Sequence, residues 1–487
     1  MSNQYQPELN RRNVLKTTGF GLTTATLAGC IGGDSDDDDD NGNGDDVGGN
    51  GTNGDDSEPE IEVDLTGVDF TYWNAINVQS RAARRASERL TNAFESQTGA
   101  TIDVSWEGYG NVIGAAWPEA FQRGDYPVLY DSVSQFGGTF VQGDWIYPAE
   151  EYLDELPDEI VSNIDWLLDS MRHQYRGLAD DTLFEIPFGF SAEIPFIGRM
   201  DHFEQAGLNP EDDFPPSNYD ELIETASALQ NDGPASYGFQ IHGDPLDVST
   251  SIVPCWTVAR AGEDGLLLNQ DMTDTNIDND VWVETFQDYV DIFREHELSN
   301  PGTPAASDEE VVPQMIGEDV AMSQIDFLNQ PTLMEQGGSL MDEGTIRWAP
   351  SWEGDAGERG IQLPFTLGVT RPPEGVDEDE YAKKQQAAIE FIALMLSEEV
   401  QLRMFEDYGL LPVRQDVWEL LPERNDRLFE SMIAMAEGSS YAWSAHPQIT
   451  GIMYSWSVPY FQEALQGNMT AQEACETAAA EIRDNVF

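Results

Sequence analysis

The hydrophobic pattern of residues 68–131 switches repeatedly between a period of two and a helical period. Three short apolar or alternating runs are typical of β-strands: residues 68–73, 100–106 and 127–131. Two stretches with apolar positions at helical spacing lie between them, at residues 81–97 and 112–123. Strands that alternate with helices predict a mostly parallel sheet with helices on both faces.

A second unit of the same kind follows from about residue 188. We expect strands at residues 237–241 and 346–352, and helices at residues 253–262 and 280–296. The apolar run 363–370 then returns the chain to the first unit. We assign Trp117, Trp256 and Trp282 to the core, because they fall within helical patterns.

Residues 183–230 connect the two units. Pro187 and Pro195 lack a backbone donor, so neither suits an uninterrupted helix or a central strand. The next long helix has Ser217 or Asn218 as its expected N-cap.

The order of motifs in this stretch resembles the crossover of family 1 extracellular solute-binding proteins, the sugar-binding class of ABC importers. The motifs are Phe203, Ala206–Leu208, Pro215–Pro216 and Tyr219–Leu222. Further matches in the expected order extend the resemblance over nearly all of residues 61–487: residues 317–322, 397–401, 409–414 and 465–474. Two departures are Val128, where the family has aspartate, and Arg199, where it has asparagine.

The resemblance implies an α/β fold of the periplasmic-binding-protein type, similar to that of maltose-binding proteins, with two lobes joined by a hinge. We expect one lobe to comprise residues 61–187 and 364–430, and the other residues 188–363 and 431–487. The hinge strands are expected near Pro187, Pro364 and residue 430. A protein of this type closes on a small solute and presents the closed form to a membrane permease. It acts as a monomer and needs no cofactor or metal.

The N-terminus has the pattern of an export signal. Arg11 and Arg12 form a twin-arginine pair, a mildly apolar run follows, and residues 27–30 end in Cys30 like a lipobox. Cleavage before Cys30 would leave a lipid-anchored protein on the outer face of the membrane, with residues 1–30 as signal. Residues 31–60 are rich in aspartate and glycine and predict a disordered acidic tether.

The charge of the chain is extreme. The net charge is −68, and the basic residues comprise 20 Arg and only 3 Lys. Acidic groups outnumber basic ones 78 to 20 from Ile61 onward. We infer a halophilic protein, because molar salt screens this repulsion. Such a charge excludes nucleic-acid binding, which requires basic patches. Cys255 and Cys475 are expected as free buried thiols.

No enzymatic motif accompanies these features. The sequence contains no GxSxG, HExxH, CxxC or GxxxxGK[ST] pattern, its one GxGxxG match lies at residues 49–54 in the expected tether, and its five histidines are scattered. The paired carboxylates of a glycosidase cannot be singled out among 91 acidic residues. We therefore expect a binding protein and no catalysis, with a secreted carbohydrate-active enzyme as the alternative.

Sugar recognition uses aromatic faces and planar polar groups beyond the carboxyl ends of strands. The candidate ligand-binding residues are Trp73, Asn74, Tyr109, Asp131, Ser134, Gln135, Glu193, Asp244, Asp326, Phe327, Trp352, Trp443, Gln448 and Tyr454. Core packing is the alternative role for each aromatic residue, and an acidic surface is the alternative for each carboxylate. The alternatives to a sugar as the bound solute are a polyol, a glycerol phosphate and a polyamine. An arginine cluster would favour phosphate, and Arg199 and Arg371 are the arginines expected near the site.

Overall fold

The computed structural model describes residues 61–75, 81–108, 116–192, 194–244, 252–421 and 426–487. The predicted export signal with Arg11, Arg12 and Cys30 lies outside the described residues, as does the acidic tether. Tyr109 and Glu193 also lie outside them.

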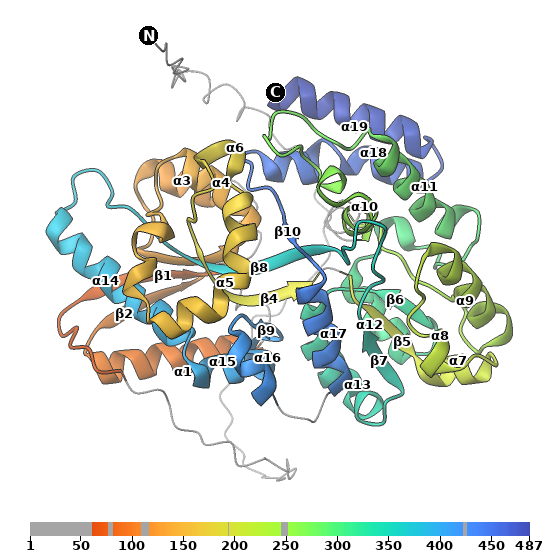
Figure 1. The fold of residues 1–487 in the computed structure, drawn as a ribbon, viewed down its shortest axis with the longest axis horizontal. Coiled ribbons are helices and arrows are strands. Elements are labelled where there is room, and N and C mark those ends of the chain that lie inside the picture. The colour runs from red at the N-terminus through yellow and green to blue at the C-terminus, as the bar shows by residue number, and fades with distance from the viewer. Residues whose placement is uncertain (1–60, 76–80, 109–115, 193, 245–251, 422–425) are drawn as a thin grey trace, which may run out of the picture. The chain divides into compact units, whose positions relative to one another are not determined.

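The larger of two β-sheets has the strand order β2-β1-β3-β8-β4-β9, and β10 pairs with β8. Strand β1 is parallel to β2 and β3, whereas β8 runs antiparallel to β3 and β4. The sheet is therefore mixed, with the returning strand β8 in its middle (Figure 1). Its strands are β1 (Asp69–Asn74), β2 (Thr101–Trp106), β3 (Leu129–Val133), β4 (Ile186–Ala192), β8 (Ile361–Val369), β9 (Leu411–Pro412) and β10 (Tyr441–Ala442).

The smaller sheet has the order β6-β5-β7, and both outer strands are antiparallel to β5. The segment 237–240 lies parallel to β6 and to the residues just before β6. It is joined to them by two isolated β-bridges, Tyr237–Val320 and Gln240–Ser323. The strands are β5 (Phe196–Arg199), β6 (Met322–Gln324) and β7 (Ile346–Ala349). The antiparallel pairs here depart from the mostly parallel pattern that we predicted. The chain enters this sheet between β4 and β5 and leaves it between β7 and β8.

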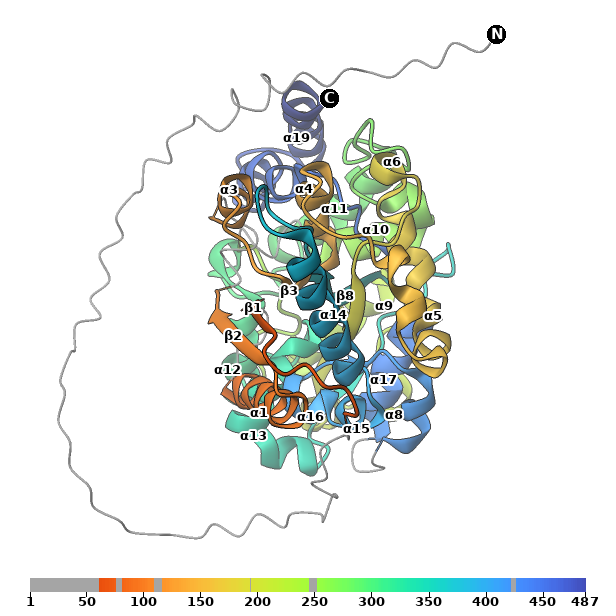
Figure 2. The same ribbon diagram turned by 90° about the vertical axis from the view of Figure 1, so that its left-hand side faces the viewer.

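Helices cover both faces of the larger sheet, as predicted. Consecutive β1 residues point to opposite faces, because side chains alternate along a strand. The Tyr72 ring contacts Phe391 of α14 at 5.8 Å, and the Trp73 ring contacts Trp117 of α3 at 5.2 Å. Figure 2 shows α14 running along the sheet beside β8. The first group of helices is α1 (Arg81–Thr98), α3 (Ala116–Arg123), α4 (Gly137–Gln142), α5 (Asp158–His173), α6 (Arg176–Ala179), α14 (Glu378–Met395), α15 (Glu398–Leu402), α16 (Met404–Tyr408) and α17 (Asp426–Glu437).

The remaining helices surround the smaller sheet or form the C-terminus. They are α7 (Met200–Gln205), α8 (Pro210–Asp213), α9 (Tyr219–Asp232), α10 (Ile252–Ala261), α11 (Asp280–Arg294), α12 (Val311–Ile316), α13 (Gln330–Asp342), α18 (Val458–Leu465) and α19 (Ala471–Val486). Asn218 is the N-cap of α9, since its side chain accepts from the backbone N–H of Glu221 at 3.0 Å. Helix α10 accommodates Pro254 in its first turn, where no helical donor is lost.

The core assignments are confirmed. Trp117, Trp256 and Trp282 are fully buried, and Cys255 and Cys475 are buried cysteines that form no disulfide within the described residues. Pro187 lies in β4 and pairs with Thr366 of β8, whereas β9 pairs only with Gly189 and Phe190. The strand is irregular at this proline, in agreement with the expectation that Pro187 does not suit an uninterrupted central strand. The strand accepts it because the pairing register shifts between Pro187 and Gly189, and the proline needs no donor at such an irregularity.

The strands also extend across two of the lobe boundaries that we expected from the sequence. Strand β4 stays in the larger sheet as far as Ala192, beyond residue 187. Strand β8 belongs to the same sheet from Ile361, before residue 364.

Candidate functional site

The strand directions bring the polar ends of both sheets together. Strands β1, β2, β3 and β4 run the same way, since β3 and β4 are both antiparallel to β8. Their carboxyl ends therefore share the edge at which β4 leads into the smaller sheet. In that sheet, β6 ends with Gln324 beside Phe196, the first residue of β5. The loops after β6 and after the segment 237–240 thus face the loops after β1, β2 and β3.

Asn74, the last residue of β1, and Asp131, which lies inside β3, are engaged in internal hydrogen bonds. Asp131 is fully buried, accepts from the Tyr72 hydroxyl at 2.9 Å and accepts from the backbone N–H of Ala75 at 2.6 Å. Asn74 is fully buried and donates to the Tyr72 hydroxyl at 3.1 Å. These two residues hold the turn after β1 in place.

Three buried polar atoms lie at the same edge without a hydrogen-bond partner among the described residues: Ser134 Oγ, Gln135 Oε1 and Trp443 Nε1. Ser134 and Gln135 form a 3₁₀ turn directly after β3. The segment that contains Trp443 is held beside this turn, because Thr139 Oγ1 donates to the carbonyl of Pro447 at 2.7 Å. Unpaired buried polar groups are costly in a folded protein. A ligand with hydroxyl groups would satisfy them.

The smaller sheet contributes a group of carboxylates. Asp326 caps the turn after β6 and accepts from Ser191 Oγ at 2.5 Å and from the backbone N–H of Leu328 at 2.8 Å. Ser191 belongs to β4, so this bond joins the two sheets directly. Burial raises the pKa of Asp326 to about 7, and the charge of Asp308 adds to the shift.

Asp308 and Asp244 complete this group. Asp308 is half-buried, accepts from Asn329 Nδ2 at 2.7 Å, and has a pKa raised by burial and by the charge of Asp244. Asp244 is half-buried and donates its backbone N–H to the carbonyl of Ala306 at 3.0 Å. Two loops after strand ends of the smaller sheet, together with the turn before α12, therefore bring three acids close to one another.

Three of the predicted aromatic residues pack into the core. Trp73 contacts Trp117 and Phe121. Buried Trp352 packs against Phe196 and Trp256, with ring centroids 5.6 Å and 5.0 Å away, and buried Phe327 packs against Trp348 at 5.1 Å. Gln448 and Tyr454 are half-buried in the segment before α18.

Sequence reasoning missed several residues at this edge. Trp106 is the last residue of β2, is half-buried, and pairs with Asn74 across the strands. The Arg84 guanidinium lies over its ring, 4.8 Å from the centroid. The rule that nominated Trp73, an aromatic residue at the end of a predicted strand, also applied to Trp106. No sequence signal indicated Ser191 or Asp308.

The two arginines that we expected near the site lie elsewhere. Arg199 ends β5 at the edge away from the crossover, is buried, and donates to Asp201 and to the carbonyl of Met315. Arg371 follows the end of β8, at the opposite edge of the larger sheet, and pairs with Asp144 at 3.1 Å. That expectation is wrong, because strand direction determines which edge each residue reaches.

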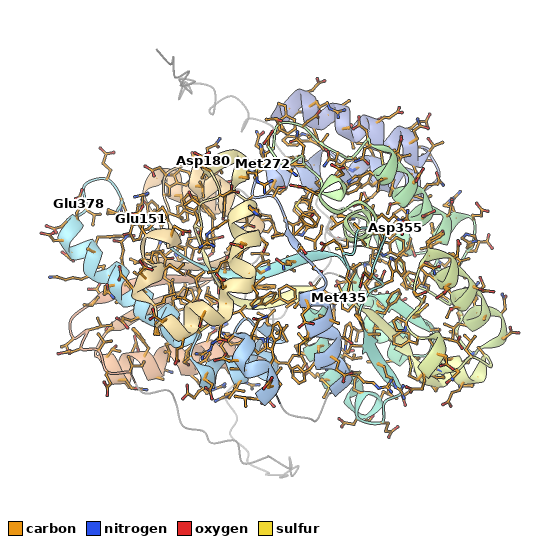
Figure 3. The ribbon with its side chains drawn as sticks, in the orientation of Figure 1. Glu151, Asp180, Met272, Asp355, Glu378 and Met435 are labelled. Atoms are coloured by element: carbon orange, nitrogen blue, oxygen red, sulfur yellow. The ribbon has the colours of Figure 1, made fainter. Side chains whose placement is uncertain are left out.

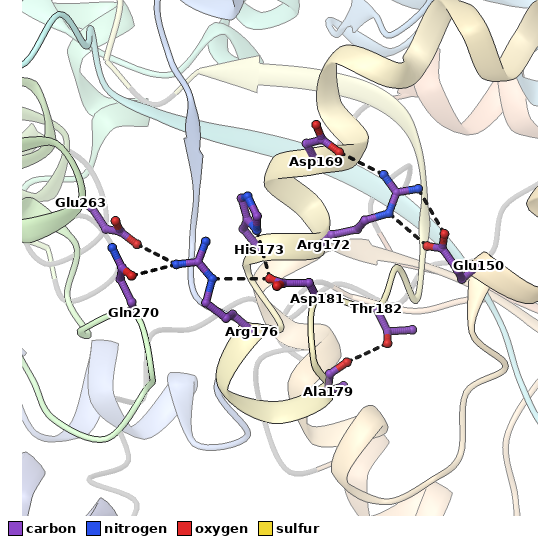
Figure 4. Close-up of polar contacts among 10 residues, drawn as sticks. All are labelled: Glu150, Asp169, Arg172, His173, Arg176, Ala179, Asp181, Thr182, Glu263 and Gln270. Atoms are coloured by element: carbon purple, nitrogen blue, oxygen red, sulfur yellow. Dashed lines mark hydrogen bonds and ion pairs between the residues drawn. The ribbon is translucent and has the colours of Figure 1, made fainter.

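Helix α6 contacts the segment after α10. Arg176 Nη1 lies 3.2 Å from Glu263 Oε1 and donates to Gln270 Oε1 at 2.9 Å, while its Nε lies 3.5 Å from Asp181 (Figure 4). Gly177 packs so closely that the backbone of Asp271 occupies the space of a side chain. Figure 3 labels Asp180, the C-cap residue of α6, and Met272, whose side chain lies beside Gly177. Because Trp256 of α10 donates to Gln324 of β6 at 3.0 Å, this contact links a helix beside the larger sheet to elements of the smaller sheet.

The described part of the chain contains no group of three or more histidine, cysteine or acidic side chains arranged to bind a metal. Within the same residues, no helix combines the length and apolarity required to cross a bilayer.

Solved structures share this fold at low sequence identity. A solute-binding protein of an ABC transporter from Thermotoga lettingae, bound with alpha-D-tagatose, has a TM-score of 0.68 and 20% identity, and the match covers 86% of this chain and 100% of that chain. The sugar-binding protein MalE from Xanthomonas citri has a TM-score of 0.68 and 16% identity, over 86% and 97% of the two chains. The GacH receptor of Streptomyces glaucescens has a TM-score of 0.66 and 15% identity, over 88% and 99%. The resemblance establishes the two-lobed fold.

No curated protein sequence matches the chain. A family model described as bacterial extracellular solute-binding protein matches residues 79–402. This match covers more than half of the sequence, so the chain belongs to the bacterial extracellular solute-binding protein family.

Proposed function

We propose that this chain captures a sugar or another hydroxyl-rich solute between its two lobes and delivers it, unaltered, to an ABC permease. The family membership carries this proposal. The structural neighbours described as binding tagatose and as a sugar-binding protein indicate the class of solute. The facing strand ends support the location, since ligands of α/β proteins bind beyond the carboxyl ends of strands.

The polar groups at these ends suit a ligand with several hydroxyl groups. Gln135 Oε1 and Ser134 Oγ offer acceptors, and Trp443 Nε1 offers a donor. Asp326 and Asp308 offer carboxyl groups from the opposite side. A solute that bonds to both sets would stabilise the closed arrangement of the lobes by its differential affinity.

We further propose that the protein is exported and anchored through its N-terminus. The twin-arginine pair Arg11–Arg12 and the lipobox ending in Cys30 support export followed by lipid attachment. The acidic residues 31–60 would act as a tether from the membrane to the binding domain. The family description as extracellular agrees with this location.

The acidic composition supports adaptation to molar salt. Binding measurements are therefore best made at molar concentrations of potassium or sodium chloride. Dialysing the protein into low salt would test the adaptation itself, because we expect the unfolding midpoint to fall.

The test of function is a thermal-shift screen of neutral sugars, oligosaccharides and polyols in molar salt. We expect at least one compound to raise the unfolding temperature increasingly with its concentration. Chromatography of the compound after incubation should show it unchanged. Failure of all compounds to bind, or release of a cleaved product, would contradict the proposal.

Two variants locate the site. Gln135→Ala and Trp443→Phe remove polar atoms that have no partner in the described structure, so they should weaken ligand binding with little loss of stability. Gln314→Ala is the matched control. Gln314 Oε1 is also buried without a partner among the described residues, but α12 lies at the far edge of the smaller sheet, next to Arg199.

A further inference from the structure

We propose that the solute carries an acidic group, a carboxylate or a phosphate ester, which Arg84 and Arg85 bind at the carboxyl edge of the larger sheet. This inference rests on the proposed solute-binding function and narrows the class of solute.

Arg84 and Arg85 lie near the start of α1. Helix α1 follows β1, so its first turn lies at the edge where β1 and β2 end. The Arg84 guanidinium lies over Trp106, the last residue of β2, which is paired with Asn74, the last residue of β1. Arg84 is thereby held at the strand ends that face the carboxylates of the smaller sheet.

Acidic side chains do little to neutralise the charges of these two arginines. Arg84 and Arg85 are both exposed. Arg84 makes one ion pair within the described residues, from Nε to Glu88 at 3.3 Å, between side chains that are 51% and 47% exposed. Such a pair between helix neighbours contributes little. Among the same residues, no hydrogen bond or ion pair neutralises Arg85.

Other arginines of the chain are used differently. Arg172, Arg414 and Arg483 each bind two carboxylates. In a domain with 78 acidic and 20 basic residues, two adjacent and weakly paired arginines are an exception.

Two positive charges near the N-terminus of α1 lower the stability of that helix. The first turn of α1 has no acidic residue, whereas α5, α9 and α14 all have aspartate or glutamate in their first turn. Cations near a helix N-terminus oppose the helix dipole. Arg84 and Arg85 are therefore unfavourable for α1 itself, and binding an anion would offset this cost.

The charged groups on the two sheets would orient a solute that carries an acidic group. A guanidinium binds carboxylate or phosphate with two parallel hydrogen bonds, and the stacking on Trp106 fixes the plane of Arg84. The nearby acids on this side include Glu88, which is paired with Arg84, Glu107, which accepts from Ser105 at 2.7 Å, and buried Asp131, which accepts from the backbone N–H of Ala75 at 2.6 Å. The three carboxylates of the smaller sheet would repel an anion. The acidic end of the solute would therefore point to Arg84 and Arg85, and its hydroxyl groups toward Asp326 and Asp308.

The experiment measures calorimetric affinities of the full chain, in molar salt, for matched neutral and acidic compounds. The carboxylate arm pairs glucose with glucuronate and galactose with galacturonate. The phosphate arm pairs glucose with glucose 6-phosphate and glycerol with glycerol phosphate. We expect the acidic member of at least one pair to bind at least tenfold more tightly than its neutral partner, and the arm that shows this effect identifies the anion.

The variants Arg84→Gln and Arg85→Gln should each reduce the affinity for the acidic compound about tenfold and leave the affinity for the neutral compound unchanged. Arg123→Gln is the matched control. Arg123 is likewise an exposed arginine with a neighbouring helix glutamate, Glu119, but it lies before β3, at the opposite edge of the sheet.

Each outcome has a distinct meaning. Neutral compounds that bind as tightly as acidic ones, with no effect of Arg84→Gln or Arg85→Gln, would overturn this inference and leave the proposed function intact. Absence of binding by every compound in both arms and in the neutral screen would overturn the proposed function as well. The unfolding midpoints of both variants should be unchanged or slightly raised, because each removes a cation from the start of α1. A large loss of stability would instead indicate a structural role and would also overturn the inference.

Discussion

The two facing sets of strand ends use aspartate in opposite ways. On the larger sheet, Asp131 accepts from Tyr72 and from the backbone of Ala75, and it holds the turn after β1. On the smaller sheet, Asp326 also accepts two hydrogen bonds, but it is grouped with Asp308 and Asp244, and its pKa is raised to about 7. The residues around a buried aspartate therefore decide its role. Asp131, surrounded by hydrogen-bond donors, holds a turn in place, whereas Asp326, close to other acids, forms part of a polar surface.

The largest expected effect concerns the pH dependence of stability. The pKa of Asp326 is about 7 in the folded protein, against an ordinary value of 3.8. The folded state therefore binds this proton more tightly, and the free energy of unfolding should fall as the pH rises from about 4 to 7. The contribution is on the order of 4 kcal/mol. Asp326→Asn should remove this part of the slope.

Denaturant unfolding at several pH values and constant molar salt measures the slope. The difference between wild type and variant isolates Asp326 from other titrating groups, among them buried Glu185, whose pKa is also raised to about 7 by burial. Parallel profiles for the two proteins would contradict the prediction.

The next effect is expected at Asp131. Asp131→Ala removes the buried carboxylate that accepts from the Tyr72 hydroxyl and from the Ala75 N–H, and the loss of an acceptor for a buried donor costs about 1–3 kcal/mol. We therefore expect a loss of about 3 kcal/mol in the free energy of unfolding. The control is Asp308→Ala: the Nδ2 of Asn329 keeps a second acceptor, the carbonyl of Asp326, and the variant also relieves repulsion with Asp244, so it should cost about 1 kcal/mol or less. Equal losses for the two variants would remove the contrast between the sheets.

A smaller effect is expected where the two sheets meet. Ser191→Ala removes the hydrogen bond from β4 to Asp326, which should lower the free energy of unfolding by about 1 kcal/mol. This bond also lowers the pKa of Asp326, so its loss should move the pH-dependent fall in stability to higher pH. The same pH series as for Asp326→Asn measures both changes, and a fall that moved to lower pH would contradict the assignment.

The smallest effect is expected at the contact of α6. Arg176→Gln removes the ion pair with Glu263, and both side chains are partly exposed. Such pairs contribute about 0.2–1 kcal/mol and less in high salt. A double-mutant cycle with Glu263→Gln, repeated at two salt concentrations, measures the coupling. A coupling above about 2 kcal/mol would show that this contact is stronger than an ordinary surface pair.

Local patterns were sufficient for most of the fold. Side-chain periodicity predicted strands β1 and β3 and the amphipathic helix α11, and capping chemistry predicted Asn218 as an N-cap. Both effects act over a few residues of the chain. The motif order from Phe203 to Leu222 was enough to indicate the family, because short motifs in a fixed order need no knowledge of distant contacts. The pattern also placed Trp117, Trp256 and Trp282 correctly in the core.

The candidate site could be predicted only in outline. The rule that ligands lie beyond strand ends selected Ser134, Gln135 and Asp326, which the structure places at facing edges. The same rule selected Trp73 and Trp352, whose rings pack against other aromatic residues, and it omitted Trp106 and Arg84. A strand pattern tells which residues alternate, but not which face receives a helix.

The sequence alone determined the alternation of strands and helices, the extreme negative charge and the family, because these depend on composition, period and short motifs. The tertiary structure alone decided that β8 returns antiparallel, that Arg199 and Arg371 lie away from the strand ends, and that Arg84 stacks on Trp106. The physical reason is that strand direction and side-chain pairing join residues far apart in the chain, and no local preference encodes those contacts.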